Sequence, residues 1–121
     1  MRFALLEHTP PSGPPHWDFL VERAGAALVP TWRLAADPLA AGGAVPAERI
    51  ADHRPLYLDY EGPVSGGRGV VRRCDGGAVV SQRSAGAELV AELAGQRLRG
   101  RVTIAPDAAG RLMLVIEAEP G

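Results

Sequence analysis

The sequence predicts a mainly β fold, a compact antiparallel β-barrel with at most one or two short helices. The apolar runs are short and are separated by clusters of turn-forming residues, which is typical of all-β domains. Many short strands at such close spacing favour a barrel or a sandwich. A chain of 121 residues is long enough for one core and too short for two, so residues 1–121 are expected to form a single domain.

The expected elements follow from alternation of apolar residues and from turn signals. Strands are expected near 2–8, 16–23, 26–34, 56–60, 68–74, 77–83, 87–94, 97–105 and 111–118. Hairpin turns are expected at "CDGG" (74–77), "AGQR" (94–97) and "PDAAG" (106–110).

Two segments are less regular. Residues 85–95 fit a short helix as well as a strand, because Ala, Glu and Leu favour helices. Residues 36–52 are rich in Ala, Gly and Pro, and a long connection with one helical turn near 47–51 is expected there.

Composition bounds the class of protein. The hydrophobic fraction is 46% and the net charge is −1, which argues against a disordered tail and against a strongly basic clamp for nucleic acid. The single cysteine, Cys74, excludes an intramolecular disulfide. No apolar run is long enough for a signal peptide or a membrane span, so a cytoplasmic location without a membrane partner is expected.

The segment "HWDFLVE" (16–22) places polar groups on one face of a strand. Alternation puts His16 and Asp18 on one face and the bulkier apolar residues on the other. His8 ends the preceding strand, so the Pro-rich loop between them can bring His8, His16 and Asp18 together. Two imidazoles and a carboxylate suit a divalent metal such as Mn²⁺, Fe²⁺ or Zn²⁺. Hydrogen-bonded surface histidines fit the same spacing.

The third histidine lies in "ADHRPLYLDYEGP" (51–63). Asp52 and His53 precede Tyr57, a combination that occurs in acid–base and phosphate-binding machinery. A solvated loop that leads into an edge strand fits the same residues.

The arginines form two patterns. Arg97, Arg99 and Arg101 alternate and predict a positive stripe on one strand, while Arg68, Arg72 and Arg73 form a second cluster. The planar guanidinium suits phosphate. A solvated outer face of a barrel explains both patterns equally.

In their order along the chain, these segments resemble the 3′-phosphoesterase module of bacterial ATP-dependent DNA ligase D. That family has a His, a spacer, and an H-Y-D-[FL]-R-L-E strand; it then has an S-W-A-V-P-K-G strand, a D-H-x-x-x-Y-x-D-F-E-G segment, a Gly-rich hairpin and an R-L-K-G-R strand. The corresponding segments here are His8, "HWDFLVE", "PTWRLAADP", "DHRPLYLDYEG", "GGRGVVRRCDGG" and "RLRGRVTI". Residues 52–62 align without a gap, and all three histidines fall at active-site positions of the family.

The resemblance implies a β-barrel with a Mn²⁺-dependent site that trims the 3′ ends of broken DNA. It implies that His8, His16 and Asp18 bind the metal, with Zn²⁺ or another divalent ion as an alternative to Mn²⁺. It also implies that His53 and Tyr57 contact the scissile phosphate. The implied partners are a nucleic-acid 3′ end or another phosphate ester, and a ligase or polymerase as a protein partner to consider.

Two departures remove positive charge. The family Arg that follows the metal-binding Asp is Leu20 here, and the Lys of the next strand falls at Ala36. Arg33 and Arg54 are the candidates to supply phosphate-binding groups instead. The sequence therefore predicts a metal-dependent phosphoesterase with weakened activity. The alternatives are a non-catalytic barrel that binds metal, nucleic acid or a protein, and a small barrel whose histidines are structural.

Overall fold

The computed structural model describes residues 1–119, and antiparallel strands make up most of them. The elements are β1 (Arg2–Thr9), β2 (His16–Val21), β3 (Val29–Leu34), β4 (Ala44–His53), η1 (Pro55–Leu58), β5 (Gly62–Pro63), β6 (Val70–Ala85), β7 (Glu88–Gly95), β8 (Arg99–Pro106) and β9 (Leu112–Ala118). The predicted mainly β, antiparallel class is confirmed, and η1 is a single short 3₁₀ helix. Within the described part of the chain, no helix is long and apolar enough to cross a membrane.

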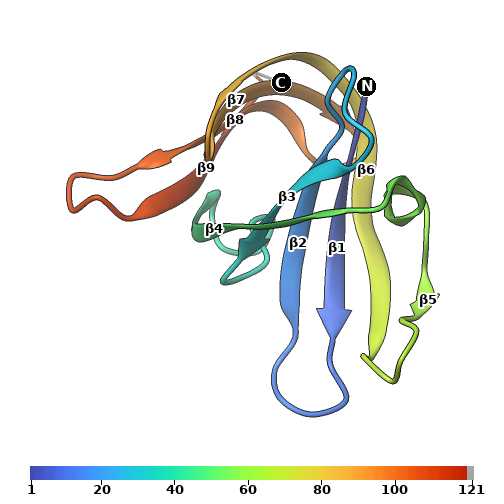
Figure 1. Ribbon diagram of the computed structural model, residues 1–121. Coiled ribbons are helices and arrows are strands. Elements are labelled where there is room, and N and C mark those ends of the chain that lie inside the picture. Colours follow the sequence, from blue (N-terminus) through green and yellow to red (C-terminus); the bar gives the residue numbers. More distant parts are fainter. Residues whose placement is uncertain (120–121) are drawn as a thin grey trace.

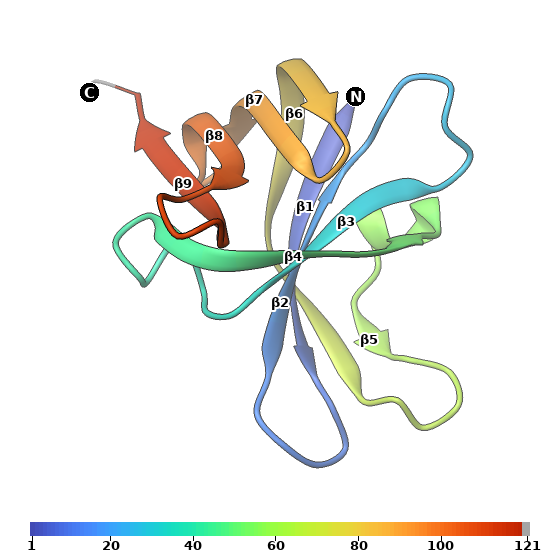
Figure 2. The same ribbon diagram turned by 60° about the vertical axis from the view of Figure 1, so that its left-hand side comes forward.

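Eight of the strands close into a hydrogen-bonded ring. Their order is β1-β2-β3-β4-β9-β8-β7-β6, and β6 pairs back with β1. The two-residue β5 pairs with the start of β6 outside this ring. The contact between β4 and β9 is short and extends from Ala44↔Val115 to Pro46↔Met113. Figures 1 and 2 show β4 crossing over β1 and β2. Residues 55–63, which contain η1 and β5, form a separate segment beside them that we call the strap.

Two expectations fail in the middle of the chain. A connection with one helical turn near 47–51 is expected over 36–52, but Ala44–His53 form β4, which pairs with β3 from Ala47↔Leu34 to His53↔Val29. Pairing with a neighbouring strand outweighs the weak strand preference of Ala, Pro and Asp in this segment. The strand expected at 56–60 is instead the helix η1, because Pro55 at its first position favours a helical turn.

The "CDGG" segment is not a turn, because β6 runs through it without a break. A Cβ on Gly76 would overlap the guanidinium of Arg73, and one on Gly77 would overlap the carbonyl of Ala94. These two glycines permit close approach within a sheet. The ambiguous segment 85–95 is mostly strand, and the expected turns near 94–97 and 106–110 are present.

Strands β1 and β2 are buried on both faces. One face contributes Phe3, Leu5, Phe19 and Val21 to the large core inside the ring. The opposite face contributes to a small core that consists of Ala4, Leu6, Leu20, Val29 and Leu58, with Tyr57 packed against it. The strap that carries η1 therefore covers the outer face of β1 and β2.

Candidate metal and phosphate site

The histidines and Asp18 meet because of strand register. His8 pairs directly with His16 across β1 and β2, and Leu6 pairs with Asp18. Side chains of directly opposed residues lie on the same face of a sheet. The potential ligand atoms of His8, His16 and Asp18 all lie within 4.8 Å of one another.

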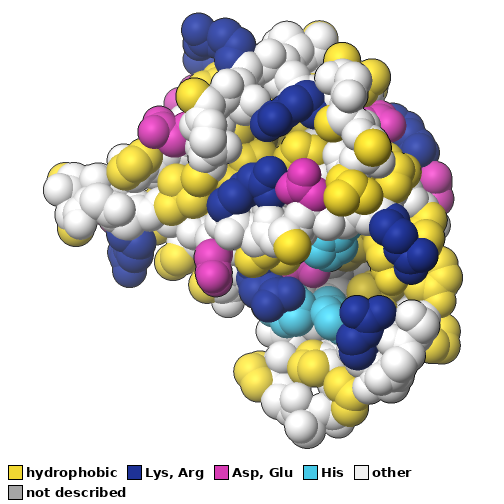
Figure 3. All heavy atoms as spheres, viewed as in Figure 1, with side chains coloured by type: hydrophobic (Ala, Val, Ile, Leu, Met, Phe, Trp, Pro, Cys, Tyr) yellow, Lys and Arg dark blue, Asp and Glu magenta, His cyan; other side chains and the backbone are white. Residues whose placement is uncertain are grey.

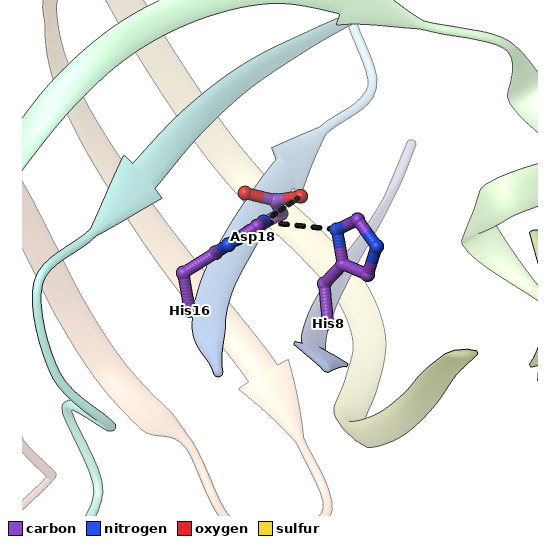
Figure 4. A group of neighbouring side chains, drawn as sticks. All are labelled: His8, His16 and Asp18. Atoms are coloured by element: carbon purple, nitrogen blue, oxygen red, sulfur yellow. Dashed lines mark hydrogen bonds and ion pairs between the residues drawn. The ribbon is translucent and has the colours of Figure 1, made fainter. Parts of the chain in front are cut away.

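The two imidazoles point toward each other beneath the carboxylate (Figure 4). Nδ1 of His8 lies 2.9 Å from Nε2 of His16. The same Nε2 atom of His16 lies 3.7 Å from Oδ2 of Asp18. The Asp18 residue is buried, with 3% of its surface exposed. Because a buried charge is costly without partners, the carboxylate of Asp18 needs these neighbours to stay ionised.

This donor set fits a divalent metal. Two imidazoles and one carboxylate supply three ligands and leave coordination positions for water or substrate. Two nitrogens at about 2.1 Å from a tetrahedral metal are separated by about 3.4 Å, so the imidazoles of His8 and His16 need only a small shift. The structure thus contains a possible metal-binding group, and its ligands are compatible with several divalent ions.

His53 and Tyr57 lie on the same side of the sheet as this group. Nε2 of His53 is 3.6 Å from Oδ2 of Asp18, and Nδ1 of His53 is 3.1 Å from the carbonyl oxygen of Ala51. The Tyr57 ring packs edge-on against the His53 ring, with 5.8 Å between the centroids. The end of β4 therefore brings the third histidine to the first two.

A pocket of about 430 Å³ connects these groups. The residues that line it include His8, Asp18, Arg33, His53, Arg54, Tyr57 and Arg68. Figure 3 shows the histidines gathered on one face, with an acidic side chain beside them and arginines on both sides. All the predicted site residues thus line this pocket or lie next to it.

Arg33 and Arg54 supply positive charge to the pocket. Arg33 pairs with Asp18 in the register of β2 and β3, and its Nε is 3.4 Å from Oδ1 of Asp18. The Arg54 guanidinium lies over the Tyr57 ring, 5.8 Å from the centroid. Within residues 1–119, no carboxylate forms an ion pair with Arg54.

Asp52, the other acidic residue of the pocket, is held by Arg49. Nη2 of Arg49 lies 2.7 Å from Oδ1 of Asp52. The Arg49 guanidinium also packs over the Trp32 ring at 5.1 Å from its centroid and donates to the carbonyl of Ile50. The charge of Asp52 is therefore balanced within the protein, and it does not offset the arginines of the pocket.

Arg68 is a pocket residue that the sequence identified only as one member of an arginine cluster. The sequence grouped it with Arg72 and Arg73, but Arg72 pairs with Glu7 and Arg73 donates to the carbonyl of Leu58. The glycines that flank Arg68 in "SGGRG" were the available signal, because they indicate a loop with unusual backbone geometry.

The predicted stripe of Arg97, Arg99 and Arg101 lies away from the pocket. In the predicted stripe, Arg99 and Arg101 are exposed and pair with Glu119 and Glu92, while Arg97 lies in the turn before β8. These pairs are typical of a solvated outer face.

The positions where the family has Arg and Lys do not offer charge to the pocket. Leu20 has 0% of its surface exposed and packs in the small core. Ala36 packs against the large core. Arg33 is thus the cation closest to Asp18 in the structure.

Burial and charged neighbours shift the pKa values of His16 and His53 in opposite directions. Burial raises the pKa of Asp18, but the facing imidazoles and guanidinium outweigh it, and that pKa lies below its ordinary value. Asp18 raises the pKa of His53, and this effect exceeds the lowering by burial. Burial lowers the pKa of His16, with nearby positive groups adding to the effect. Near neutral pH, His16 is suited to be a neutral ligand and His53 to be a proton donor.

Comparisons with known proteins add no family assignment. The sequence matches no protein-family model and no curated protein.

Proposed function

We propose that this protein is a metal-dependent phosphoesterase similar to the 3′-end-processing module of DNA ligase D. The observation that carries the proposal is one pocket that combines a possible metal-binding group with a protonatable histidine and the guanidinium groups of Arg33 and Arg54. The expected substrate is a nucleic-acid 3′ end or another phosphate ester. Mn²⁺ is the expected metal, by resemblance to the family.

The residues divide the work of phosphate-ester cleavage. A bound divalent metal would polarise the phosphoryl group and offset its developing charge. Arg33 and Arg54, which line the pocket, would bind the non-bridging oxygens through their planar donors. His53 would donate a proton to the leaving oxygen through Nε2, the nitrogen on the side of Asp18, since Nδ1 faces the Ala51 carbonyl. The Tyr57 ring fixes the orientation of that imidazole.

Metal binding is the first test of this proposal. Mn²⁺ at 100 times its dissociation constant should stabilise the wild type by about 2.7 kcal/mol. His16→Ala should abolish that stabilisation, whereas Arg101→Ala, which alters an arginine on the outer face, should retain it. Metal analysis of the purified protein and thermal unfolding with and without Mn²⁺ provide the readout. A wild type that binds no divalent metal would leave the histidines with a structural role.

Release of phosphate is the second test. A DNA primer-template with a 3′-phosphate should lose that phosphate in the presence of Mn²⁺, and His53→Ala should lower the rate by about 10²–10⁴-fold. A wild-type protein that releases phosphate no faster than His53→Ala would contradict the proposed phosphoesterase activity.

A non-catalytic metal- or nucleic-acid-binding module is the alternative. The observation that favours it is the apolar packing of Leu20 and Ala36, where the family has Arg and Lys. Metal binding without phosphate release, combined with binding of a 3′-phosphorylated DNA end that His53→Ala weakens, would select this alternative.

A further inference from the structure

The loop that joins β5 to β6, residues 64–69, contacts the histidine group through a backbone carbonyl. Nε2 of His8 lies 2.6 Å from the carbonyl oxygen of Arg68. A carbonyl oxygen can only accept a hydrogen bond, so Nε2 carries the hydrogen. In the neutral imidazole, Nδ1 then carries the lone pair, and Nδ1 is the nitrogen that lies 2.9 Å from His16.

The backbone of this loop is closely constrained. The N–H of Val64 donates to the carbonyl of Gly69 at 2.8 Å and closes the loop. Nε of Arg68 donates to the carbonyl of Ser65 at 2.8 Å, which ties the side chain back onto its own loop. Gly69 has φ +96°, and a Cβ there would overlap the backbone of Thr9. The loop therefore lies directly on the end of β1, one residue beyond the histidine that it contacts.

We infer that the 64–69 loop is a positioning element that holds His8 in its Nε2-protonated tautomer, with the Nδ1 lone pair directed at Nε2 of His16. Its value to the site rests on the proposed function, because a ligating imidazole is oriented and made more basic when its outer nitrogen donates to a carbonyl. The tautomer itself requires neither metal nor substrate. It can therefore be tested separately from the proposed function.

The test compares two glycine substitutions in the same loop. Gly69→Ala must shift the loop away from Thr9, whereas Gly67→Ala places its Cβ where no other atom lies within 4 Å. Both glycines have positive φ, so Gly67→Ala controls for backbone strain alone. Two-bond ¹H–¹⁵N correlation spectra of the metal-free protein at about pH 8, above the ordinary histidine pKa of about 6.5, identify the protonated nitrogen. A His8→Gln variant assigns the signals.

The expected spectra show His8 protonated at Nε2 in the wild type and in Gly67→Ala, and a mixture of tautomers in Gly69→Ala. Calorimetric titration with Mn²⁺ should then give an affinity about 10–100-fold weaker for Gly69→Ala than for Gly67→Ala. A wild type with the proton on Nδ1 would overturn the inference. A folded Gly69→Ala protein with the wild-type tautomer and affinity would also overturn it.

A measurement on the wild type alone guards against a variant that does not fold. A scalar coupling across the hydrogen bond, from Nε2 of His8 to the carbonyl carbon of Arg68, should be detectable in the metal-free protein, and its absence would count against the inference. A protein that binds no Mn²⁺ but shows this coupling and the Nε2 tautomer would contradict the proposed function and leave the positioning role intact.

Discussion

Strands β1 and β2 bury both of their faces, and the two faces differ in what covers them. The inner face contributes aromatic and branched aliphatic side chains to the core of the ring. The outer face is apolar only over the half that lies beneath η1, and then it becomes polar at His8, Asp18 and His16. The interior of a large sheet tolerates no unpartnered charge. On the outer face, η1 covers the apolar half, and Asp18 has Arg33, His16 and His53 as partners.

The strap is held by polar contacts in its middle, between the end of η1 and the start of β5. Arg2 pairs with Asp59 at 2.7 Å, Arg73 donates to the carbonyl of Leu58, and the carboxylate of Glu61 accepts the N–H of Arg73. Exposed ion pairs contribute little to stability, so the strap depends mainly on its few buried apolar side chains. The comparison therefore predicts that stability resides mostly in the inner face and function in the outer one.

The largest effect is expected from Leu20→Arg, which would restore the family's arginine. Leu20 is fully buried in the small core, so the new guanidinium would lose its hydration among apolar side chains. The variant should lose at least about 3–5 kcal/mol of unfolding free energy, as buried unpaired charges do. Leu20→Met is the volume-matched control and should lose less than about 1.5 kcal/mol. Urea unfolding followed by circular dichroism measures both.

A folded Leu20→Arg protein with faster phosphate release would contradict the assignment of Leu20 to a closed apolar core on the outer face. It would mean that the outer face opens toward the pocket, as in the family that the sequence resembles. The structure instead assigns the cation beside Asp18 to Arg33.

The inner and outer cores can be compared directly by truncation. Phe19→Ala removes a fully buried ring from the large core and should cost about 3–5 kcal/mol. Leu58→Ala removes a side chain from the small core and should cost about 2 kcal/mol, at the low end for such changes, because the strap can move into the space. Equal losses in urea unfolding would show that the strap is as rigid as the ring.

The site residues that the sequence grouped and that the structure brings together share one property, which is that their chemistry is carried by the side chain. His8, His16 and Asp18 could be grouped because alternation along β2 and a short connection fix their positions. His53 and Tyr57 followed from the resemblance, and the structure places them at the same pocket. Their roles in catalysis remain predictions that the assays above test.

Other features could not be read from residue types. The contact of Arg68 with the site is made by a backbone carbonyl, which every residue possesses. Strand β4 was missed because its pairing with β3 is a tertiary effect that outweighs local propensity. The glycines at 76 and 77 were read as a turn, although close packing against Arg73 and Ala94 explains them.

A smaller effect is expected from removing charge at the pocket without disturbing either core. Arg33→Ala should lower the rate of phosphate release about a hundredfold, since one lost contact to transition-state charge costs roughly 3 kcal/mol. Arg101→Ala removes an exposed arginine that pairs with Glu92 on the ring and should change neither the rate nor the stability measurably. A similar loss of rate in both variants would indicate a general effect of charge and not a bound phosphate.

The smallest effect is the pH dependence of stability in the metal-free protein, measured with a chelator present. The folded-state pKa of His53 is raised, chiefly by Asp18, so its contribution is fully present below the unfolded pKa of about 6.5 and is lost as pH rises through the folded pKa. The stability difference between wild type and His53→Gln should therefore be larger in mildly acidic than in alkaline buffer. The folded-state pKa of His16 is lowered, so its contribution to stability is lost as pH falls. The stability difference between wild type and His16→Gln should therefore be smaller in mildly acidic than in alkaline buffer. If urea unfolding of the two variants gave the same pH dependence, the division of the histidines into a neutral ligand and a proton donor would be wrong.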